Sequence, residues 1–142
     1  MQGHNSDIVM NGTFGEVWFD GEYMAEVKKC RLEVAIEYTE IGRVRNLTPG
    51  QKMTALKPEG EVTFNKVSST VTKKVAAKLK KGQAPKFTII SNLDDPAALG
   101  AERVAAYGCA FEKMTLADWE NGSLTEENYS FKFENYELLD TV

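Results

Sequence analysis

The stretch Lys29-Cys-Arg-Leu-Glu-Val-Ala-Ile-Glu-Tyr38 alternates apolar and mostly charged residues without a break. In a β-strand, successive side chains point to opposite faces, so this spacing places the apolar residues on one face. That face carries Cys30, Leu32, Val34, Ile36 and Tyr38, and the other carries Lys29, Arg31, Glu33, Ala35 and Glu37. The stretch therefore predicts a long strand with one side on protein and the other in water.

A tight turn precedes this strand. Phe14–Asp20 mixes aromatic and β-branched residues, which favour strands, and Asp20-Gly21 is a strong hairpin signal. Later stretches with strand character cover residues 59–67, 85–91, 102–114 and 123–138. Within the third of these, Gly108 predicts a bulge or bend.

One helix is predicted over residues 69–81. Val71, Val75 and Leu79 recur at helical spacing opposite a row of lysines, and Gly82 follows as a typical stop. Lysines near the end of a helix complement its dipole, so we interpret the row as a solvated face rather than a binding patch.

Residues 39–58 show no sustained period. Glycine and proline, which interrupt regular elements, recur there among basic residues. We predict a long inter-strand loop, which in a compact domain is usually functional or mobile. Its basic residues are Arg43, Arg45, Lys52 and Lys57.

The length of 142 residues is that of one domain. The predicted elements amount to about six or seven strands with one flanking α-helix, which fits a mostly β fold. We therefore expect a β-sandwich or barrel of two packed antiparallel sheets. It should form a single domain over residues 1–142, with a loose N-terminus over residues 1–10.

The chain is acidic, with a net charge of −4 and a pI near 5.1. Dedicated nucleic-acid binders usually carry an excess of Lys and Arg, so this balance argues against that class. No apolar run approaches the roughly 18 residues of a bilayer-spanning helix, and the first residues lack the pattern of a signal peptide. We expect a protein that is made in a cytosol and does not enter a membrane.

Residues that could support catalysis are scarce. His4 is the only histidine and lies in the expected loose terminus, so nucleophilic triads lack a base. Cys30 and Cys109 lie far apart in apolar stretches, which predicts buried thiols rather than a disulfide, a redox pair or a metal site. Asp94 and Asp95 precede a proline, where carboxylates usually accept backbone hydrogen bonds. We expect no metal, no cofactor and no enzyme activity, although a carboxylate-only enzyme stays open.

A series of short motifs, in order and at similar spacing, resembles one family over almost the whole chain. The motifs are Val9-Met-Asn-Gly-Thr-Phe-Gly-Glu-Val-Trp-Phe-Asp-Gly21, Ala25-Glu-Val-Lys-Lys29, Val67-Ser-Ser69, Gly82-Gln-Ala-Pro-Lys-Phe87, Leu93-Asp-Asp-Pro96 with Gly100-Ala-Glu-Arg103, Thr115-Leu-Ala-Asp-Trp-Glu120 and Phe131-Lys-Phe-Glu-Asn-Tyr-Glu-Leu-Leu-Asp140. They are similar to those of tail tube proteins from contractile-tailed phages of Gram-positive bacteria, PBSX-type prophage particles and diffocin-like R-type bacteriocins.

This resemblance implies a tail tube fold of two sheets with a flanking helix. It also implies hexameric rings that stack into the inner tube within a contractile sheath, with tape-measure, baseplate and tail-terminator proteins as further partners. Long hairpins from each copy would join into a barrel around a lumen, through which DNA or other cargo passes without specific binding. The expected location is the tail of a virion or phage-like particle, after assembly in the host cytoplasm.

Two hypotheses about sites follow from the resemblance. We expect the polar faces of the second and last predicted strands to give the lumen a negative lining, which Lys29, Arg31 and Lys132 on the same faces would weaken. The lumen-facing candidates are Glu33, Glu37, Glu126 and Glu134. We also expect the basic loop over residues 39–58 to contact the next ring, because copies of an acidic subunit offer complementary charge.

Alternatives remain for both the loop and the function. The loop could be a merely mobile surface segment. The second functional class is a small β-barrel binding module for a ligand or an oligonucleotide, which the strand count and the basic helix suggest.

Overall fold

The computed structural model describes residues 8–12, 15–66 and 70–141. Within them the chain forms eight strands and one helix. In chain order these are β1 (Gly15–Phe19), β2 (Glu22–Tyr23), β3 (Val27–Arg43), β4 (Asn46–Asn65), α1 (Thr70–Lys80), β5 (Lys86–Leu93), β6 (Glu102–Phe111), β7 (Glu126–Lys132) and β8 (Asn135–Asp140). The prediction of a mostly β fold with one flanking helix is confirmed.

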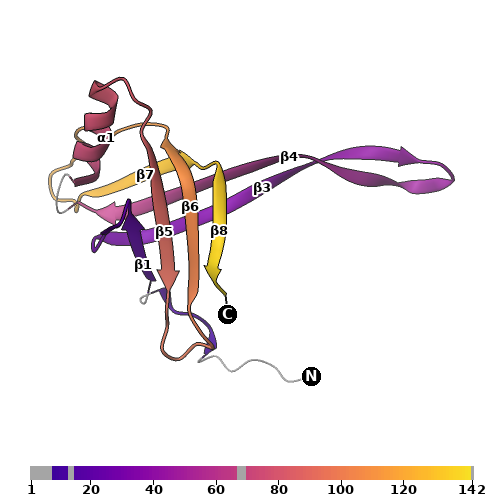
Figure 1. The fold of residues 1–142 in the computed structure, drawn as a ribbon, viewed down its shortest axis with the longest axis horizontal. Coiled ribbons are helices and arrows are strands. Elements are labelled where there is room, and N and C mark those ends of the chain that lie inside the picture. Colours follow the sequence, from indigo (N-terminus) through magenta and orange to yellow (C-terminus); the bar gives the residue numbers. More distant parts are fainter. Residues whose placement is uncertain (1–7, 13–14, 67–69, 142) are drawn as a thin grey trace.

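All of these strands belong to one antiparallel sheet, in the order β2-β1-β5-β6-β7-β4-β3, with β8 paired to β6. The sheet folds over itself: in Figure 1, β5, β6 and β8 run across the direction of β3 and β4, and α1 lies at one end. The two layers are joined by pairing of β6 with β7 at Ala110↔Lys132 and Phe111↔Phe131. The two expected sheets are therefore halves of one hydrogen-bonded sheet.

β6 forms the corner between the layers because it changes partner along its length. Residues 103–107 pair with β8, whereas Ala110 and Phe111 pair with β7. Between these parts, Gly108 has a φ of 66°, a left-handed conformation that glycine adopts without strain. The register against β5 shifts at the same place. The bulge or bend predicted at Gly108 is confirmed.

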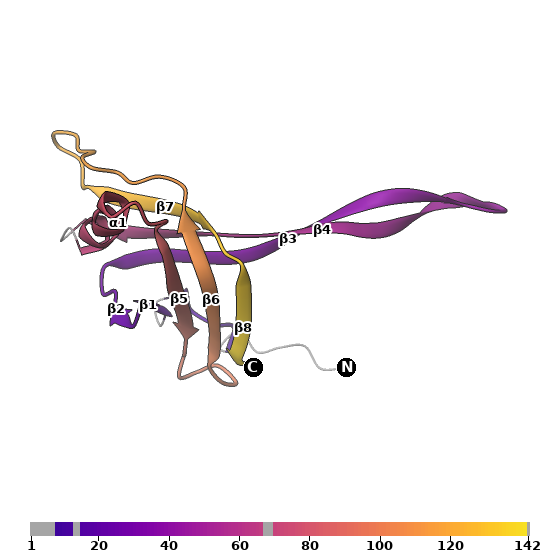
Figure 2. The ribbon, with the colours of Figure 1, turned by 45° about the horizontal axis from the view of Figure 1, so that its top comes forward.

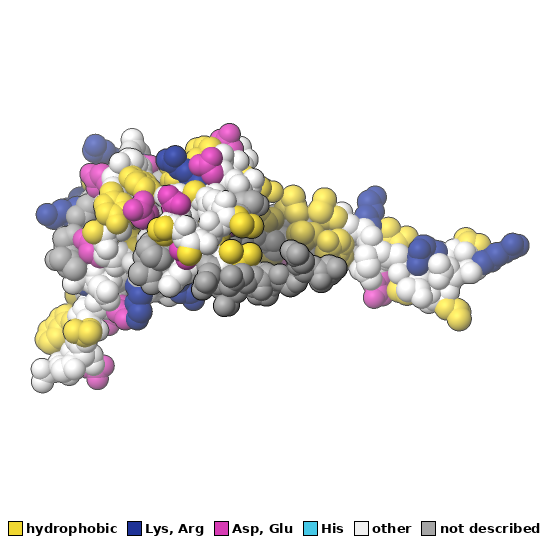
Figure 3. Space-filling model, turned by 90° about the horizontal axis from the view of Figure 1, so that it is seen from below, with side chains coloured by type: hydrophobic (Ala, Val, Ile, Leu, Met, Phe, Trp, Pro, Cys, Tyr) yellow, Lys and Arg dark blue, Asp and Glu magenta, His cyan; other side chains and the backbone are white. Residues whose placement is uncertain are grey.

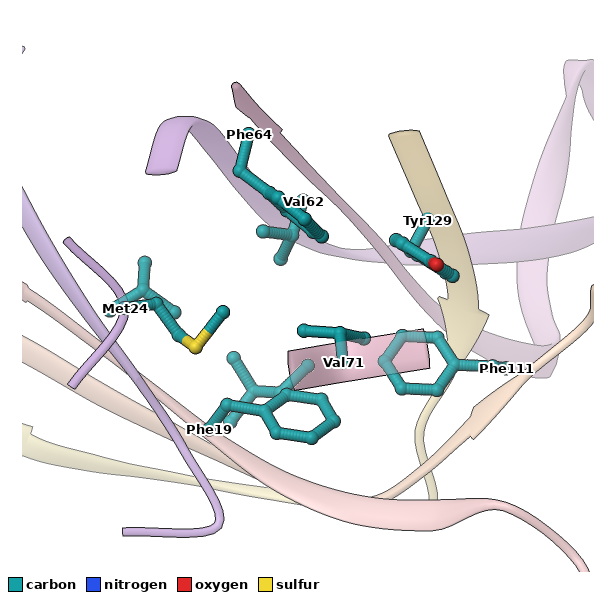
Figure 4. Close-up of a pocket in the computed structure, with 9 residues that line it drawn as sticks. Phe19, Met24, Val62, Phe64, Val71, Phe111 and Tyr129 are labelled. Atoms are coloured by element: carbon teal, nitrogen blue, oxygen red, sulfur yellow. The ribbon is translucent and has the colours of Figure 1, made fainter. Parts of the chain in front are cut away.

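The core lies between the two layers and beside α1. Figure 4 shows side chains from β1, β4, α1, β6 and β7 that point toward one another. The ring of Phe111 stacks on Phe19 at 5.6 Å between centroids and meets Tyr129 at 5.4 Å and a steep angle. The Tyr129 hydroxyl lies 3.1 Å from the Thr72 hydroxyl, so this buried phenol has a hydrogen-bond partner. The gap left among these side chains measures only about 10 Å³.

The predicted helix is present as α1, and residue 69, its predicted first residue, lies outside the described residues. It ends as predicted at Gly82, whose φ is 71°. The Gly82 N–H donates to the Leu79 carbonyl at 3.0 Å, and the Gln83 N–H donates to the Lys78 carbonyl at 2.9 Å. These two bonds satisfy carbonyls that a helix end leaves free.

We expected the lysines of α1 to form a solvated face, but two of them pack on the sheet. The Lys74 ammonium lies 5.4 Å from the centroid of the Phe19 ring and 3.0 Å from the Glu22 carboxylate. The Lys78 ammonium lies 4.0 Å from the centroid of the Phe87 ring. Both therefore help to hold the helix against the layer that contains β1 and β5.

The prediction of a long loop over residues 39–58 is wrong. β3 continues to Arg43 and β4 begins at Asn46, so only a two-residue turn interrupts a long hairpin. Pro49 and Pro58 contributed to the wrong prediction of a loop because proline usually interrupts strands. Before Glu59, however, β4 has no second partner among the described strands, and proline is tolerated on such an edge.

Two other strand predictions need correction. The last predicted strand, over residues 123–138, is two strands, since β7 pairs with β4 whereas β8 pairs with β6. The hairpin at Asp20-Gly21 is confirmed, with φ values of 51° and 85°. It leads into the short β2, however, and the long strand is β3. Residues 1–7 of the expected loose N-terminus lie outside the described residues.

Gly60 allows β4 to approach the core closely. A Cβ on this residue would lie 2.7 Å from atoms of the Phe131 ring and 2.8 Å from the Arg31 carbonyl oxygen. The ring is 1% exposed and the carbonyl belongs to the neighbouring strand, so neither has room to move.

Replacing Gly60 by alanine is expected to lower the free energy of unfolding by about 2 kcal/mol, a typical cost of overpacking a core. Gly42→Ala is the matched control, because a Cβ there meets nothing within 4 Å. Urea denaturation of the two variants measures the difference. Equal stabilities would show that the contact at Gly60 does not constrain the fold.

Candidate assembly surfaces

A two-stranded arm extends from the body of the protein. It consists of residues 34–43 of β3 and 46–58 of β4, paired from Val34↔Pro58 to Arg43↔Asn46. Figures 1 and 2 show the arm leaving the body as an isolated ribbon. At the usual rise per residue of a strand, it reaches about 30 Å. A two-stranded ribbon alone in water is only marginally stable, so its surroundings in an assembly matter.

One face of the arm is apolar. Ile36 lies opposite Leu56, and Tyr38 lies opposite Met53. Directly opposite residues of antiparallel strands share a face, so these four form one patch, called here the arm patch. Their exposed fractions lie between 47% and 57%.

The arm patch is the outer end of a row that begins in the core. Cys30, Leu32 and Val34 precede it on the same face of β3 and pack against the core, partly buried. In Figure 3, hydrophobic side chains gather where the arm leaves the body, and basic side chains lie farther out. One strand face thus passes from the protein interior into water. Contiguous exposed apolar surface of this kind usually marks an interaction site.

The opposite face of β3 and β4 is polar, and many of its charges are paired. The Lys57 ammonium lies 2.6 Å from Glu37, whose hydrogen bond and charge raise the pKa of Lys57. Arg31 pairs with Glu33 and also lies 3.5 Å from Glu61. These pairs are exposed and add little stability, but they compensate one another's charge.

Three of the four predicted lumen carboxylates lie on this polar face. Glu33 and Glu37 belong to β3, and Glu126 belongs to β7, which extends the same face beyond β4. The Glu126 carboxylate lies 2.6 Å from the Lys28 ammonium. Each of the three is therefore paired with a cation, and of the basic residues expected to weaken the lining only Arg31 is among these partners.

Glu134 is not on this face. It lies in the connection between β7 and β8, and its N–H donates to the Tyr107 carbonyl at 3.0 Å. Its carboxylate lies 2.7 Å from the Lys86 ammonium at the start of β5, which lowers the pKa of Glu134. The structure therefore separates Glu134 from the other candidates.

The basic residues predicted to contact the next ring are spread along the arm. Arg43 and Arg45 lie at the tip, where Arg45 has a φ of 58° in the turn. The Arg43 guanidinium donates to the Thr48 carbonyl at 2.8 and 3.2 Å. Lys52 lies midway along the arm, and Lys57 lies at its base, in the pair described above. Only the two arginines share one site.

The connection between β6 and β7 carries exposed apolar side chains that the sequence analysis did not identify as a site. Leu116, Trp119 and Leu124 are 72%, 76% and 94% exposed. Asp118 and Glu120 flank the tryptophan. No periodic pattern marks this segment. Two signals could have drawn attention to it: an isolated tryptophan among turn-forming residues, and its place in the motif Thr115–Glu120 of the family resemblance.

An open, mostly apolar groove adjoins the base of the arm. It measures about 540 Å³ and lies between β3 and the strands β5, β6 and β8. Leu32 and Val34 line one side, and Tyr136 and Leu138 of β8 line the other. Tyr136 and Leu138 are 49% and 60% exposed. The apolar surface therefore continues from the arm patch onto β8.

Residues that could hold a metal ion are not clustered in the described part of the chain. No cluster of three or more His, Cys, Asp or Glu residues is placed there to hold a metal ion. The Asp95 carboxylate accepts the backbone N–H groups of Asn11 and Ala97, both at 2.9 Å, as its turn predicted. His4 lies outside the described residues. No described helix has the length and apolar character needed to cross a membrane.

Comparison with known proteins gives these surfaces a context. A family model described as phage tail tube protein matches residues 3–140. The chain belongs to the phage tail tube protein family. It is 30% identical over 135 residues to the phage-like element PBSX protein XkdM of Bacillus subtilis (strain 168), a match that covers 94% of this chain and 92% of the relative. The resemblance seen in the sequence motifs is confirmed.

Solved structures show that this tail tube protein has the fold of contractile and related tail components. The tube-terminating cap of the anti-feeding prophage superposes with a TM-score of 0.72 at 9% identity, over 93% of this chain and 91% of that one. The tail of an empty gene transfer agent particle, determined with C6 symmetry, superposes with a TM-score of 0.57 at 10% identity, over 93% and 100%. The expected tail tube-like fold is confirmed.

Both thiols of this tail tube protein are free and shielded. Cys109 is fully buried, its Sγ donates to the Ala106 carbonyl at 3.4 Å, and burial raises its pKa to about 12. Cys30 is partly buried, and burial raises its pKa as well. Neither pKa favours the reactive thiolate at neutral pH.

We expect iodoacetamide at pH 8 to label less than about 10% of Cys109 in the time that labels the urea-unfolded chain completely, because the thiolate is scarce and enclosed. Cys30 should react at an intermediate rate. Peptide mass spectrometry measures both residues in one sample, and the unfolded chain is the control. Rapid labelling of Cys109 in the folded protein would contradict its position in the core.

Proposed function

We propose that this chain is the structural subunit of the inner tube of a contractile phage tail or phage-like particle, and that it catalyses nothing. Copies assemble into hexameric rings, and the rings stack around a channel for DNA or other cargo. The observation that carries this proposal is the arm patch, which continues the core row of β3 into water. Another copy of the chain covers it in the assembled tube.

Burial of the arm patch between copies stabilises the assembly. Its four side chains are each about half exposed in the single chain. Fully burying a side chain of this size contributes about 1.5–3 kcal/mol, so the patch supplies about 3–6 kcal/mol per subunit before the entropic cost of association. Because every subunit in a ring repeats the contact, a modest local contribution is multiplied.

Free strand edges support the same proposal. β3 is the last strand of the sheet, and β4 has no second partner before Glu59 among the described strands. Pairing of these edges between copies adds main-chain hydrogen bonds and closes the hairpins into a barrel. The closed barrel also removes edges that would otherwise invite uncontrolled association. The C6 symmetry of the gene transfer agent tail, which shares the fold, supports six copies per ring.

The polar face of β3, β4 and β7 lines the channel in this proposal, so Glu33, Glu37 and Glu126 face the lumen. Strong attraction to DNA depends on Lys and Arg that are available to phosphates. Here Arg31 and Lys57 are paired with carboxylates. We therefore propose a lining close to neutral rather than strongly negative, along which DNA passes without sticking.

Other contacts place the tube in the particle. The arm tip, with Arg43 and Arg45, contacts the next ring together with Lys52, while Lys57 belongs to the lining. The sheath, tape-measure, baseplate and terminator proteins are the further partners that we propose. The finished protein lies in the tail of a virion or phage-like particle.

The double change Ile36→Ser and Leu56→Ser is expected to reduce rings and tubes at least about tenfold, because it removes apolar area that only assembly buries. The melting temperature of the free subunit should stay within a few degrees, since both residues lie outside the core. Negative-stain microscopy of concentrated protein and thermal melting are the measurements.

The double change Ala35→Ser and Ala55→Ser is the matched control, because it alters the polar face of the same arm. This control should assemble like the unmodified chain. If the Ile36→Ser, Leu56→Ser protein formed tubes in unchanged yield, the arm patch would not be an interface and the proposal would lose its main support.

A further inference from the structure

The two ends of the molecule differ in charge. The outer half of the arm, residues 41–52, carries Arg43 and Arg45 at the tip, Lys52 nearer the middle, and no acidic residue. Residues 114–124, in the connection between β6 and β7, carry Asp118 and Glu120 and no basic residue. Neither carboxylate forms an ion pair with a described residue, and neither does Arg45. Each end thus presents uncompensated charge of one sign.

Both ends also expose apolar side chains. Val44 and Leu47 at the tip are 92% and 104% exposed, and Leu116, Trp119 and Leu124 in the connection are 72–94% exposed. An indole flanked by carboxylates suits an arginine, because the guanidinium stacks on an aromatic face and pairs with carboxylates at the same time. Charge and apolar surface therefore match between the two ends.

The two ends cannot meet within one chain. Figures 1 and 2 both place the connection between β6 and β7 at the end of the molecule opposite the arm tip, with the body and the whole arm between them. Complementary surfaces at opposite ends make a head-to-tail contact. Repetition of such a contact builds closed rings or open filaments.

We propose that the arm tip of one copy docks on residues 114–124 of another copy. Arg45 lies against the Trp119 ring and its flanking carboxylates, and Val44 and Leu47 lie against Leu116 and Leu124. This inference rests on the proposed tube function, to which it adds the receiving surface for the arm. The occupant of the acidic, tryptophan-bearing end is therefore a second copy of this chain.

Charge reversal at each end tests the contact. The tip variant carries Arg45→Glu with Lys52→Glu, and the connection variant carries Asp118→Lys with Glu120→Lys. Each should assemble at least about tenfold less than the unmodified chain, because attraction becomes repulsion at every contact. Lys73→Glu with Lys80→Glu on the exposed side of α1 matches the charge change of the tip variant and should leave assembly unchanged.

Mixing distinguishes a contact between copies from an effect within one chain. In an equimolar mixture, the acidic tip of the tip variant meets the basic connection of the connection variant, and the two unaltered ends also match. The mixture should therefore recover at least about half of the unmodified assembly, and so should the chain that carries all four changes. Sedimentation measures the assembled fraction, and circular dichroism confirms that each variant is folded.

Particle shape and recovery on mixing report on different claims. Rings or tubes of the unmodified chain in negative stain support the tube function, whereas recovery on mixing supports the tip contact at any assembled size. The contact is overturned if either reversed variant assembles normally, or if folded variants show no recovery when mixed. Absence of any assembly by the unmodified chain would contradict both claims.

Discussion

The long hydrogen-bond ladder between β3 and β4 is the interaction on which the rest of the structure depends. It carries one row of apolar side chains from the core of the body into water. Near Leu32 the row packs against the core, and from Ile36 onward it lies in water. The body fixes the base of the hairpin, and the hydrogen-bond ladder carries that alignment outward to the tip. The exposed apolar face of the arm is thereby held at a defined distance from the body and in a defined orientation.

The body is organised so that this ladder is anchored firmly. Gly108 lets β6 leave β8 and join β7, which turns one sheet into two layers around the aromatic core. Gly60 lets the Phe131 ring lie directly on β4, so the base of the hairpin is clamped between the core and β7. The exposed ion pairs of the polar face add little to this anchoring, and their main effect is to keep that face close to neutral.

Local pattern predicts the parts of the fold where one face is buried in the body, and it fails in the arm, whose outer part has no core beside it. The alternation from Lys29 to Tyr38 and the helix before Gly82 could be read directly. Beyond Tyr38 the arm has no core beside it, so its prolines and glycines resemble a loop. The alternation of Glu134 with Phe133 predicts that Glu134 shares the polar face of β7. The chain turns into β8 at this point, however, and the Glu134 carboxylate pairs with Lys86, which no local pattern predicts. The exposure of Trp119 likewise depends on how the connection between β6 and β7 packs against the body, which no local pattern predicts.

The most direct test of the account is hydrogen exchange of the arm in the free subunit and in assembled tubes. Peptides covering residues 34–58 report on the arm, and peptides from β5 and β6 report on the body. We expect arm amides to exchange at least about tenfold more slowly in tubes, because strands that are open to water in the free subunit become paired and covered there. The body should be protected in both states. Equal exchange of the arm in the two states would contradict the claim that another copy covers it.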